Sequence, residues 1–401
     1  MEVKKSFLII CLILFIFSIA SVSASDVNDT AADSVDDSVS VSADDSVSVS
    51  AVNQNSISVV NVNNQTNKTD ELLGISPDNE DIQVGGVIGA SMEEDDLLGA
   101  DFSNLVSEFN VVAGYPINTY GNYTATGGQN PSLTTSNHII DGHGGTWDRT
   151  NSYTGRILQV SAGISNLVFK NITFKNGHGV AGGAVYFAGA ASDITFSDCT
   201  FVYNGRRGNV DGGAINFNGA ATNINFINCT FRSNVGGDGG AIYFNTNTNG
   251  ITFTGCNFLN NNASGSGHGS NAGNSDSTGQ VKGASICFGD AVTNTANNIK
   301  FINTVFDSNS AFTTNNHQQA RGNVFFTASG TDLSFENCNF TNNNAIGTAD
   351  DGHNTHTSGA GIYFQSTVKN LNITKCNFIN NSCHSHLSAG PYPIDSSGTA
   401  V

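Results

Sequence analysis

The chain of 401 residues is poor in charge, with only 12% Asp, Glu, Lys and Arg, and it contains just 5 Pro, 2 Met and 1 Trp. So little charge excludes a long coiled coil and argues against a typical helical enzyme. The mature chain shows no sustained helical periodicity. Instead, β-branched and aromatic residues alternate with small polar ones, and 26 Phe supply much of the apolar mass. This pattern predicts an all-β fold of strands and turns.

Basic residues are also scarce. The formal net charge is −18, with 15 Lys and Arg against 33 Asp and Glu. Between Asp26 and Asp101 there are 17 carboxylates and one cation, Lys68, whereas the rest of the chain after Asp101 carries 15 carboxylates and 12 cations. Neither part has a basic face, so we expect no nucleic-acid partner.

Long apolar runs are confined to the N-terminus. Lys4 and Lys5 precede an apolar stretch of 14 residues, 7–20, and a small-residue cleavage site follows at 22–24. Residues 1–24 are therefore predicted to be a secretory signal peptide. The stretch is short for a membrane span, and an uncleaved anchor is the alternative. We expect a secreted or cell-surface protein that contacts the membrane only through this segment before cleavage.

Residues 25–100 resemble a spacer. Residues 36–51 read DDSVSVSADDSVSVSA, a perfect eight-residue tandem repeat with acidic pairs and no large side chains. Because such a segment has little to bury, we predict that 25–100 is disordered and acidic. The folded part is then 101–401, with an N-terminal region at 101–165 and repeated rungs at 166–383.

Two phrases recur through the rungs. The first reads GGAVYF, GGAINF, GGAIYF, GASICF, GNVFF and GAGIYF, and the second reads Ile-x-Phe-x-x-Cys-x-Phe-x-x-Asn. Seven copies of the second phrase, 27 to 48 residues apart, align at Phe174, Phe201, Phe231, Phe258, Phe306, Phe340 and Phe378. The Cys position holds Cys199, Cys229, Cys256, Cys338 and Cys376, with Ile172 and Thr304 as substitutes. The terminal asparagines are Asn204, Asn234, Asn261, Asn309, Asn343 and Asn381.

A repeat of about 27 residues with two or three short strands is the length of one coil of a parallel β-helix. A single coil cannot bury its apolar face, whereas coils stacked about 4.8 Å apart bury a continuous column and pair their backbones. Like residues then stack, so Phe201 is predicted to lie on Phe231. Glycine pairs such as Gly212-Gly213 fit a bend that needs positive φ or leaves no room for a Cβ. The terminal asparagines are expected to tolerate left-handed conformations and to form a hydrogen-bonded ladder.

Two long spacings reflect insertions at 263–282 and 345–359. Insertions in a solenoid are expected to leave the stack as loops, often on one face, where binding surfaces arise.

The paired GGAI and Phe-x-x-Asn phrases resemble the repeats of chlamydial polymorphic outer-membrane proteins. The layout of signal, Asn/Asp/Ser-rich spacer, IIDG motif and GGAIYF…ITFTGCNFLNN rungs resembles adhesin-like surface proteins of methanogenic archaea. That resemblance implies a right-handed, single-stranded, pectate-lyase-like parallel β-helix. It also implies a cell-surface protein that contacts other cells, surfaces or glycans.

The repeated cysteines invite a disulfide interpretation, because the protein is predicted to be exported. Side chains of one column point the same way, so we favour buried free thiols that act as small apolar groups. The local clusters His353/His356 and Cys383/His384/His386 lack acidic ligands at a suitable spacing and favour solvated residues over a metal site. We expect neither a metal nor another cofactor.

Catalysis is the main rival hypothesis, because β-helices include polysaccharide lyases and hydrolases. Hydrolases need two positioned carboxylates, and lyases need a carboxylate-bound cation with an Arg or Lys base. The candidate carboxylates do not recur as a pair; they are Asp141, Asp198, Asp211, Asp238, Asp307 and Glu336, with Arg206-Arg207 near Asp211. We therefore assign no catalytic residue and predict a non-enzyme.

Three functions remain in contention. The first is an adhesin-like scaffold that binds extracellular glycans or the surfaces of other cells through insert loops and sheet faces. The second is a polysaccharide lyase or glycoside hydrolase, and the third is a structural envelope component without a specific ligand. Glycosylation is expected at sequons in the spacer and loops, namely Asn64, Asn67 and Asn262.

Overall fold

The computed structural model describes residues 129–150, 155–206, 211–264, 280–313, 319–349, 356–387 and 395–397, with Leu97, Leu98 and some positions between 101 and 127. All of them belong to the unit Asn67–Val401. The predicted signal peptide lies outside the described residues, as does the predicted spacer apart from Leu97–Leu98. The proposed glycosylation sites Asn64 and Asn67 fall in that undescribed part.

Every element that the structure defines within the described residues is a β-strand, and the strands form five sheets. Sheet 1 contains β4 (Ser132–Leu133), β7 (Leu158–Val160), β10 (Val185–Phe187), β13 (Ile215–Phe217), β17 (Ile242–Phe244), β22 (Ile286–Phe288), β27 (Val324–Phe326) and β32 (Ile362–Phe364). Sheet 2 contains β1 (Leu97–Leu98), β2 (Ile117–Tyr120), β5 (His138–Asp141), β8 (Ser165–Lys170), β11 (Ala191–Ser197), β14 (Ala221–Ile227), β18 (Thr248–Thr254), β23 (Thr295–Ile302), β28 (Ser329–Glu336) and β33 (Val368–Thr374).

Sheet 3 contains β3 (Tyr123–Thr124), β6 (Thr146–Asp148), β9 (Thr173–Lys175), β12 (Thr200–Val202), β15 (Thr230–Arg232), β19 (Asn257–Leu259), β24 (Val305–Asp307), β29 (Asn339–Thr341) and β34 (Asn377–Ile379). Sheet 4 contains β16 (Val235–Gly236), β20 (Asn262–Ser264), β25 (Ser310–Thr313), β30 (Asn344–Ala349) and β35 (Ser382–Leu387). Sheet 5 contains β21 (Gln280–Lys282), β26 (Gln319–Arg321), β31 (His356–Ser358) and β36 (Asp395–Ser397).

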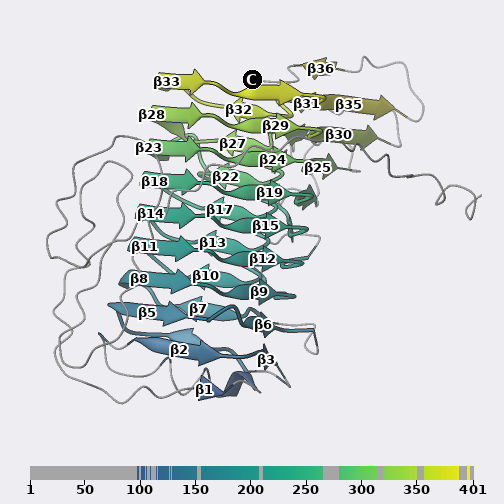
Figure 1. Cartoon of the computed structure of the whole chain (residues 1–401). Coiled ribbons are helices and arrows are strands. Elements are labelled where there is room, and N and C mark those ends of the chain that lie inside the picture. Colours follow the sequence, from purple (N-terminus) through teal and green to yellow (C-terminus); the bar gives the residue numbers. More distant parts are fainter. Residues whose placement is uncertain are drawn as a thin grey trace, which may run out of the picture. The chain divides into compact units, whose positions relative to one another are not determined.

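Consecutive coils pair in parallel and in register. The chain runs through sheets 1, 2 and 3 in turn, and β11 pairs with β14 such that Ile194 lies on Ile224 and Phe196 on Phe226. Figure 1 shows the strands of successive coils lying one above the other from β5 to β33. The predicted fold class, an all-β right-handed parallel β-helix, is confirmed. The sheets also begin earlier than the predicted rungs, because β1 inside the predicted spacer pairs with β2.

Three columns of stacked phenylalanines fill the core, one behind each of sheets 1, 2 and 3. The rings of Phe201 and Phe231 lie 4.7 Å apart and almost parallel, at 3°. The ring of Phe258 lies a further 4.7 Å along the same column. At the N-terminal end the buried side chains of Phe102, Leu105 and Phe109 join this core. Aromatic burial therefore supplies the main stabilisation of the stack.

The two residues of each glycine pair have different tasks. Gly212 has a φ of 67°, in the left-handed region. Gly213 has no room for a side chain, because a Cβ there would lie 2.1 Å from the carbonyl oxygen of Gly240 and 2.7 Å from that of Val235. The second glycine is replaced by Ala284 and Ala360 in two coils that come directly after an insertion.

The terminal asparagines form a buried ladder between sheets 3 and 4. The Asn234 Nδ2 donates hydrogen bonds to the carbonyl oxygen of Phe201 at 3.0 Å and to Asn261 Oδ1 at 3.0 Å, and the Asn204 Nδ2 donates to Asn234 Oδ1 at 3.1 Å. The expectation that these asparagines are left-handed is wrong. The left-handed residues, with φ between 54° and 58°, precede them by one position and are Tyr203, Ser233, Asn260, Ser308, Asn342 and Asn380.

The insertions are not simple loops, which corrects the expectation for 263–282 and 345–359. Their ends are paired strands, β20 and β21 for the first and β30 and β31 for the second. Sheets 4 and 5 pack on each other through a cluster of small side chains, Ala263, Val281, Ala284, Ala311 and Ala320. The later coils thus carry an extra two-layer arm, visible in Figure 1 as β25, β30, β35, β31 and β36.

Candidate functional site

The cysteine column is a structural feature of the core. Cys199, Cys229, Cys256 and Cys338 are buried free thiols, and Cys229 Sγ donates to the carbonyl oxygen of Phe196 at 3.4 Å. Burial raises the pKa of the Cys256 thiol well above its usual value. Ile172 and Thr304, which replace cysteine in two coils, are equally buried. A protonated thiol without solvent access is a poor nucleophile, so we assign this column no chemistry.

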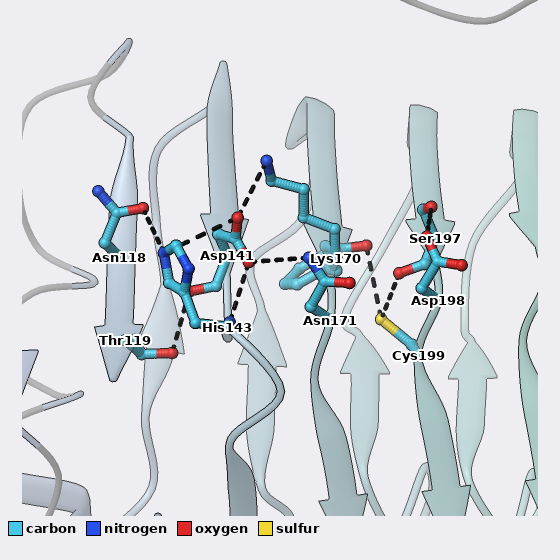
Figure 2. A network of polar contacts seen from close by, with 10 residues as sticks. Asn118, Thr119, Asp141, His143, Lys170, Asn171, Ser197, Asp198 and Cys199 are labelled. Carbon is cyan, nitrogen blue, oxygen red and sulfur yellow. Dashed lines mark hydrogen bonds and ion pairs between the residues drawn. The ribbon is translucent and has the colours of Figure 1, made fainter. Parts of the chain in front are cut away.

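Asp141, the aspartate of the IIDG motif, lies at the end of β5 in a polar network (Figure 2). Its Oδ2 lies 3.0 Å from Lys170 Nζ in the next coil, and its Oδ1 accepts hydrogen bonds from the His143 N–H at 2.9 Å and from Asn171 Nδ2 at 3.2 Å. Burial raises the pKa of Asp141, but these donors and the Lys170 charge outweigh burial, and the net pKa lies below the usual value. The carboxylate is therefore ionised and fully engaged.

The same arrangement recurs at Asp148, at the end of β6. Lys175 Nζ lies 3.0 Å from Asp148 Oδ2, and Asn176 Nδ2 donates to Asp148 Oδ1 at 2.8 Å. Both Asn171 and Asn176 are left-handed, with φ values of 55° and 58°. Two equivalent aspartate–lysine–asparagine sets thus join the same pair of coils. This repetition identifies the network as a clamp between coils, a structural role that also explains Asp141.

The clamps predict a loss of stability in acid. Burial raises the pKa of Asp148, but the hydrogen bonds from Thr150, Asn176 and Lys175 outweigh burial. The net pKa of Asp148 therefore lies below its usual value, as that of Asp141 does. The unfolded carboxyls titrate near pH 3.9, so the stabilisation is complete above about pH 4 and is lost as the pH falls through the lower folded-state values. We expect Asp141→Asn/Asp148→Asn to cost about 2 kcal/mol at pH 7. The difference from wild type in urea unfolding should shrink toward pH 3, and a difference independent of pH would contradict the clamps.

The other carboxylates weighed in the sequence are spread along the ladders. Asp198 Oδ1 accepts from Asn228 Nδ2 at 3.3 Å, and Asp307 Oδ1 accepts from Asn342 Nδ2 at 3.0 Å. Glu336 lies 4.0 Å from Lys375 on the exposed surface of the last coils. None of these three is hydrogen-bonded or ion-paired to a second candidate carboxylate in any described contact.

A buried charge cluster that the sequence did not reveal lies where the first insertion returns to sheet 1. Lys282 Nζ lies 3.2 Å from Asp238 Oδ2 and 3.7 Å from Asp290 Oδ1, and the Tyr243 hydroxyl donates to Asp290 Oδ1 at 3.1 Å. Burial raises the pKa of Asp238 to about 6, with Lys282 opposing and the Asp211 charge adding to the rise. The cluster fixes the base of the arm. The sequence contains a sign of this cluster. The position directly before the first glycine of the GGAI-type phrase is charged in four successive coils, where it holds Asp211, Asp238, Lys282 and Arg321.

Arginine–tyrosine pairs between neighbouring coils are the most distinctive surface feature. The guanidinium of Arg156 lies 4.0 Å from the centre of the Tyr186 ring on sheet 1. Arg321 lies 4.9 Å from the Tyr363 ring on the same sheet and donates to the Tyr363 hydroxyl at 2.7 Å.

A third pair lies at the edge of sheet 3. There the guanidinium of Arg232 is 5.9 Å from the ring of Tyr203, which is 51% exposed. Within each pair the residues are about one coil apart in the sequence, a regularity that could have been found before the structure. Arginine and tyrosine are the residue types that most often dominate binding energy at protein surfaces.

The residues that the sequence suggested for glycosylation or metal binding do not form such sites among the described residues. Asn262, expected in a loop, is half-buried in β20, and its Oδ1 is buried without a hydrogen-bond partner. His356 lies in β31 and Cys383 in β35, whereas His353 is outside the described residues. Across the described ranges, no three His, Cys, Asp or Glu side chains gather as metal ligands would, and no helix is long and apolar enough to cross a membrane.

No family model matches the chain, and no curated protein matches it. The similar solved structures include an alginate lyase from Paenibacillus sp. str. FPU-7, at 12% identity and a TM-score of 0.36, covering 70% of this chain and 99% of that one. They also include PfbA, a surface adhesin of Streptococcus pneumoniae, at 11% identity and a TM-score of 0.35, covering 69% and 88%. Values this low leave the function to be argued from the site itself.

Proposed function

We propose that the protein is a secreted or cell-surface scaffold that binds glycans or glycan-bearing surfaces of other cells without chemical turnover. The observation that carries this proposal is the set of arginine–tyrosine pairs displayed by adjoining coils. A tyrosine ring offers an apolar face to a sugar, and a guanidinium offers five donors to its oxygens.

The rigidity of the stack supports a binding role. Backbone pairing and stacked rings hold neighbouring coils in register, so each pair has a fixed position before a ligand arrives. A preformed surface spends less free energy on ordering side chains during binding. The predicted signal and the resemblance to adhesin-like surface proteins of methanogenic archaea favour display outside the cell.

The test is binding of the full chain to immobilised plant, mucin and microbial polysaccharides. We expect saturable retention on one class of glycan, reduced at least 5-fold by Tyr186→Ala or Tyr203→Ala, because each removes a ring from the surface. Retention that never saturates, or that is equal for all polysaccharides, would instead support a structural envelope component.

A second candidate, a polysaccharide lyase, is favoured by one observation. The Tyr120 and His143 rings stack at 4.2 Å beside Lys170, and His143 Nε2 lies 3.2 Å from Asn118 Oδ1. His, Tyr and Lys are the types of side chain that abstract protons in such reactions. Unsaturated sugar ends that disappear in Lys170→Ala and His143→Ala would establish this activity and overturn the non-enzymatic proposal.

A further inference from the structure

Three basic side chains that form no ion pair with a described carboxylate lie together near the N-terminal end of sheet 1. Elsewhere in the described stack, Lys170, Lys175 and Lys282 each have an aspartate within 3.2 Å. In contrast, no described carboxylate forms an ion pair with Arg156, His178 or Arg206. In a chain with a net charge of −18, a cationic cluster that finds no acid of its own is an unusual surface.

Backbone contacts bring the three residues together from two coils. The His178 N–H donates to the carbonyl oxygen of Gly155 at 2.9 Å, which places His178 beside Arg156. A Cβ added at Gly179 would lie 3.0 Å from the Arg156 Cβ, so these two segments are in contact. The Gly205 N–H donates to the carbonyl oxygen of Gly177 at 2.7 Å, which sets Arg206 one coil above His178.

Electrostatics agrees with this placement. The pKa of His178 lies below its usual value because of burial, and because the charges of Arg206 and Arg149 oppose its protonation. Burial also lowers the pKa of Arg156. The charges of Arg206 and Arg149 therefore oppose a positive charge on His178, and no described acid is ion-paired with the cluster. A bound anion would relieve that repulsion.

The surroundings of Arg156 suit a sugar acid better than a simple anion. Arg156 Nη1 donates to Gln159 Oε1 at 3.1 Å, and its guanidinium covers the half-buried Tyr186 ring. An arginine fork fixed in this way pairs with a carboxylate through two parallel hydrogen bonds, and the Gln159 amide and Tyr186 ring can meet hydroxyls and a ring face.

The cluster ends at Asp211. The carbonyl oxygen of Asp211 accepts from the Gly182 N–H at 3.1 Å, and Asp211 Oδ1 accepts from the Asp238 N–H at 3.2 Å, so an aspartate precedes the glycine pair of each of the next two coils. A polyanion is therefore favoured over the coils that carry β7 and β10.

We propose that Arg156, His178, Tyr186 and Arg206 form a site for the carboxylate groups of an acidic glycan, a chain of uronate residues. This inference rests on the proposed glycan-binding function and names the ligand class and the place.

The experiment measures the affinity of the full chain for polygalacturonate and for the same polymer with its carboxylates methyl-esterified. We expect saturable binding to polygalacturonate that is at least 10-fold weaker for the esterified polymer. Arg156→Ala/Arg206→Ala should weaken polygalacturonate binding at least 10-fold. Arg156→Lys, which keeps the charge and removes the fork, should weaken it about 3-fold or more.

The matched control is Lys369→Ala, which removes one exposed cation from β33 of sheet 2, outside the arginine–tyrosine pairs, and should change the affinity less than 2-fold. Thermal unfolding of each variant shows whether it is folded. Equal binding of the two polymers, or equal effects of Lys369→Ala and the double variant, would overturn the acidic-glycan site. If a neutral polysaccharide binds and polygalacturonate does not, this inference fails while the proposed function stands. If no glycan binds, both fail.

Discussion

Replacing Asn234 by alanine should destabilise the fold by about 3–5 kcal/mol, because it removes a fully buried side chain whose amide is satisfied on all sides. Asn234 Oδ1 accepts from both the backbone N–H and the Nδ2 of Asn204, at 3.0 and 3.1 Å. The variant leaves these donors and the carbonyl oxygen of Phe201 unpaired in a dry interior. Urea unfolding followed by circular dichroism measures the loss.

The control for Asn234 is Asn223→Gly on the outside of the stack, because Asn223 is left-handed, with a φ of 53°, and glycine adopts that conformation without strain. Asn223 Nδ2 makes a single exposed hydrogen bond, to Asp193 Oδ1 at 3.1 Å. We expect a loss of about 0.5–1 kcal/mol there, since water replaces the lost partner. Similar losses at Asn223 and Asn234 would show that the buried ladder is not the main polar support of the stack.

Gly213→Ala should cost more than about 3 kcal/mol, although it adds only one methyl group. The new Cβ would lie 2.1 Å from the Gly240 carbonyl oxygen and 2.7 Å from that of Val235. Both are backbone atoms of the next coil, so they move only if the coils separate. The readout is the midpoint of thermal unfolding, or soluble yield if the variant does not fold.

The comparison variant is Ala284→Gly, at the equivalent position of a coil that carries an insertion. Here the natural methyl group fits, and its removal should cost about 1 kcal/mol through chain flexibility and one lost buried methyl. If Gly213→Ala were as stable as wild type, the backbone at Gly213 could not be as close to the Gly240 carbonyl oxygen as described, and the account of this bend would be wrong.

The coil and its core were predictable because the sequence repeats them. Apolar residues two apart, as in Ile224 and Phe226, point to one face, and the repeat then aligns each with its neighbour in the next coil. The glycine pair was predictable in kind, since either positive φ or lack of space demands glycine. Only the structure of the bend shows that Gly212 has the positive φ and that Gly213 is the one without space for a Cβ.

The arm, the charge cluster and the arginine–tyrosine pairs were not predicted. The arm and the charge cluster depend on irregular parts of the repeat, whereas the arginine–tyrosine pairs have a one-coil spacing that the sequence already contained. β20 and β21 are short strands, and they are recognised as strands because they pair with β25 and β26 of the next coil. Asp238 and Lys282 are far apart in sequence because the first insertion separates them. The left-handed residues were misassigned by one position because asparagine occupies both that column and the buried ladder, and composition alone does not distinguish them.

The most direct test of the account exposes the full chain to the polysaccharide panel and records retained protein and newly formed reducing or unsaturated ends in the same wells. The account predicts saturable retention on acidic glycans with no new ends. New ends that disappear when Asp141, His143 or Lys170 is replaced would contradict it and would make the protein a carbohydrate-degrading enzyme.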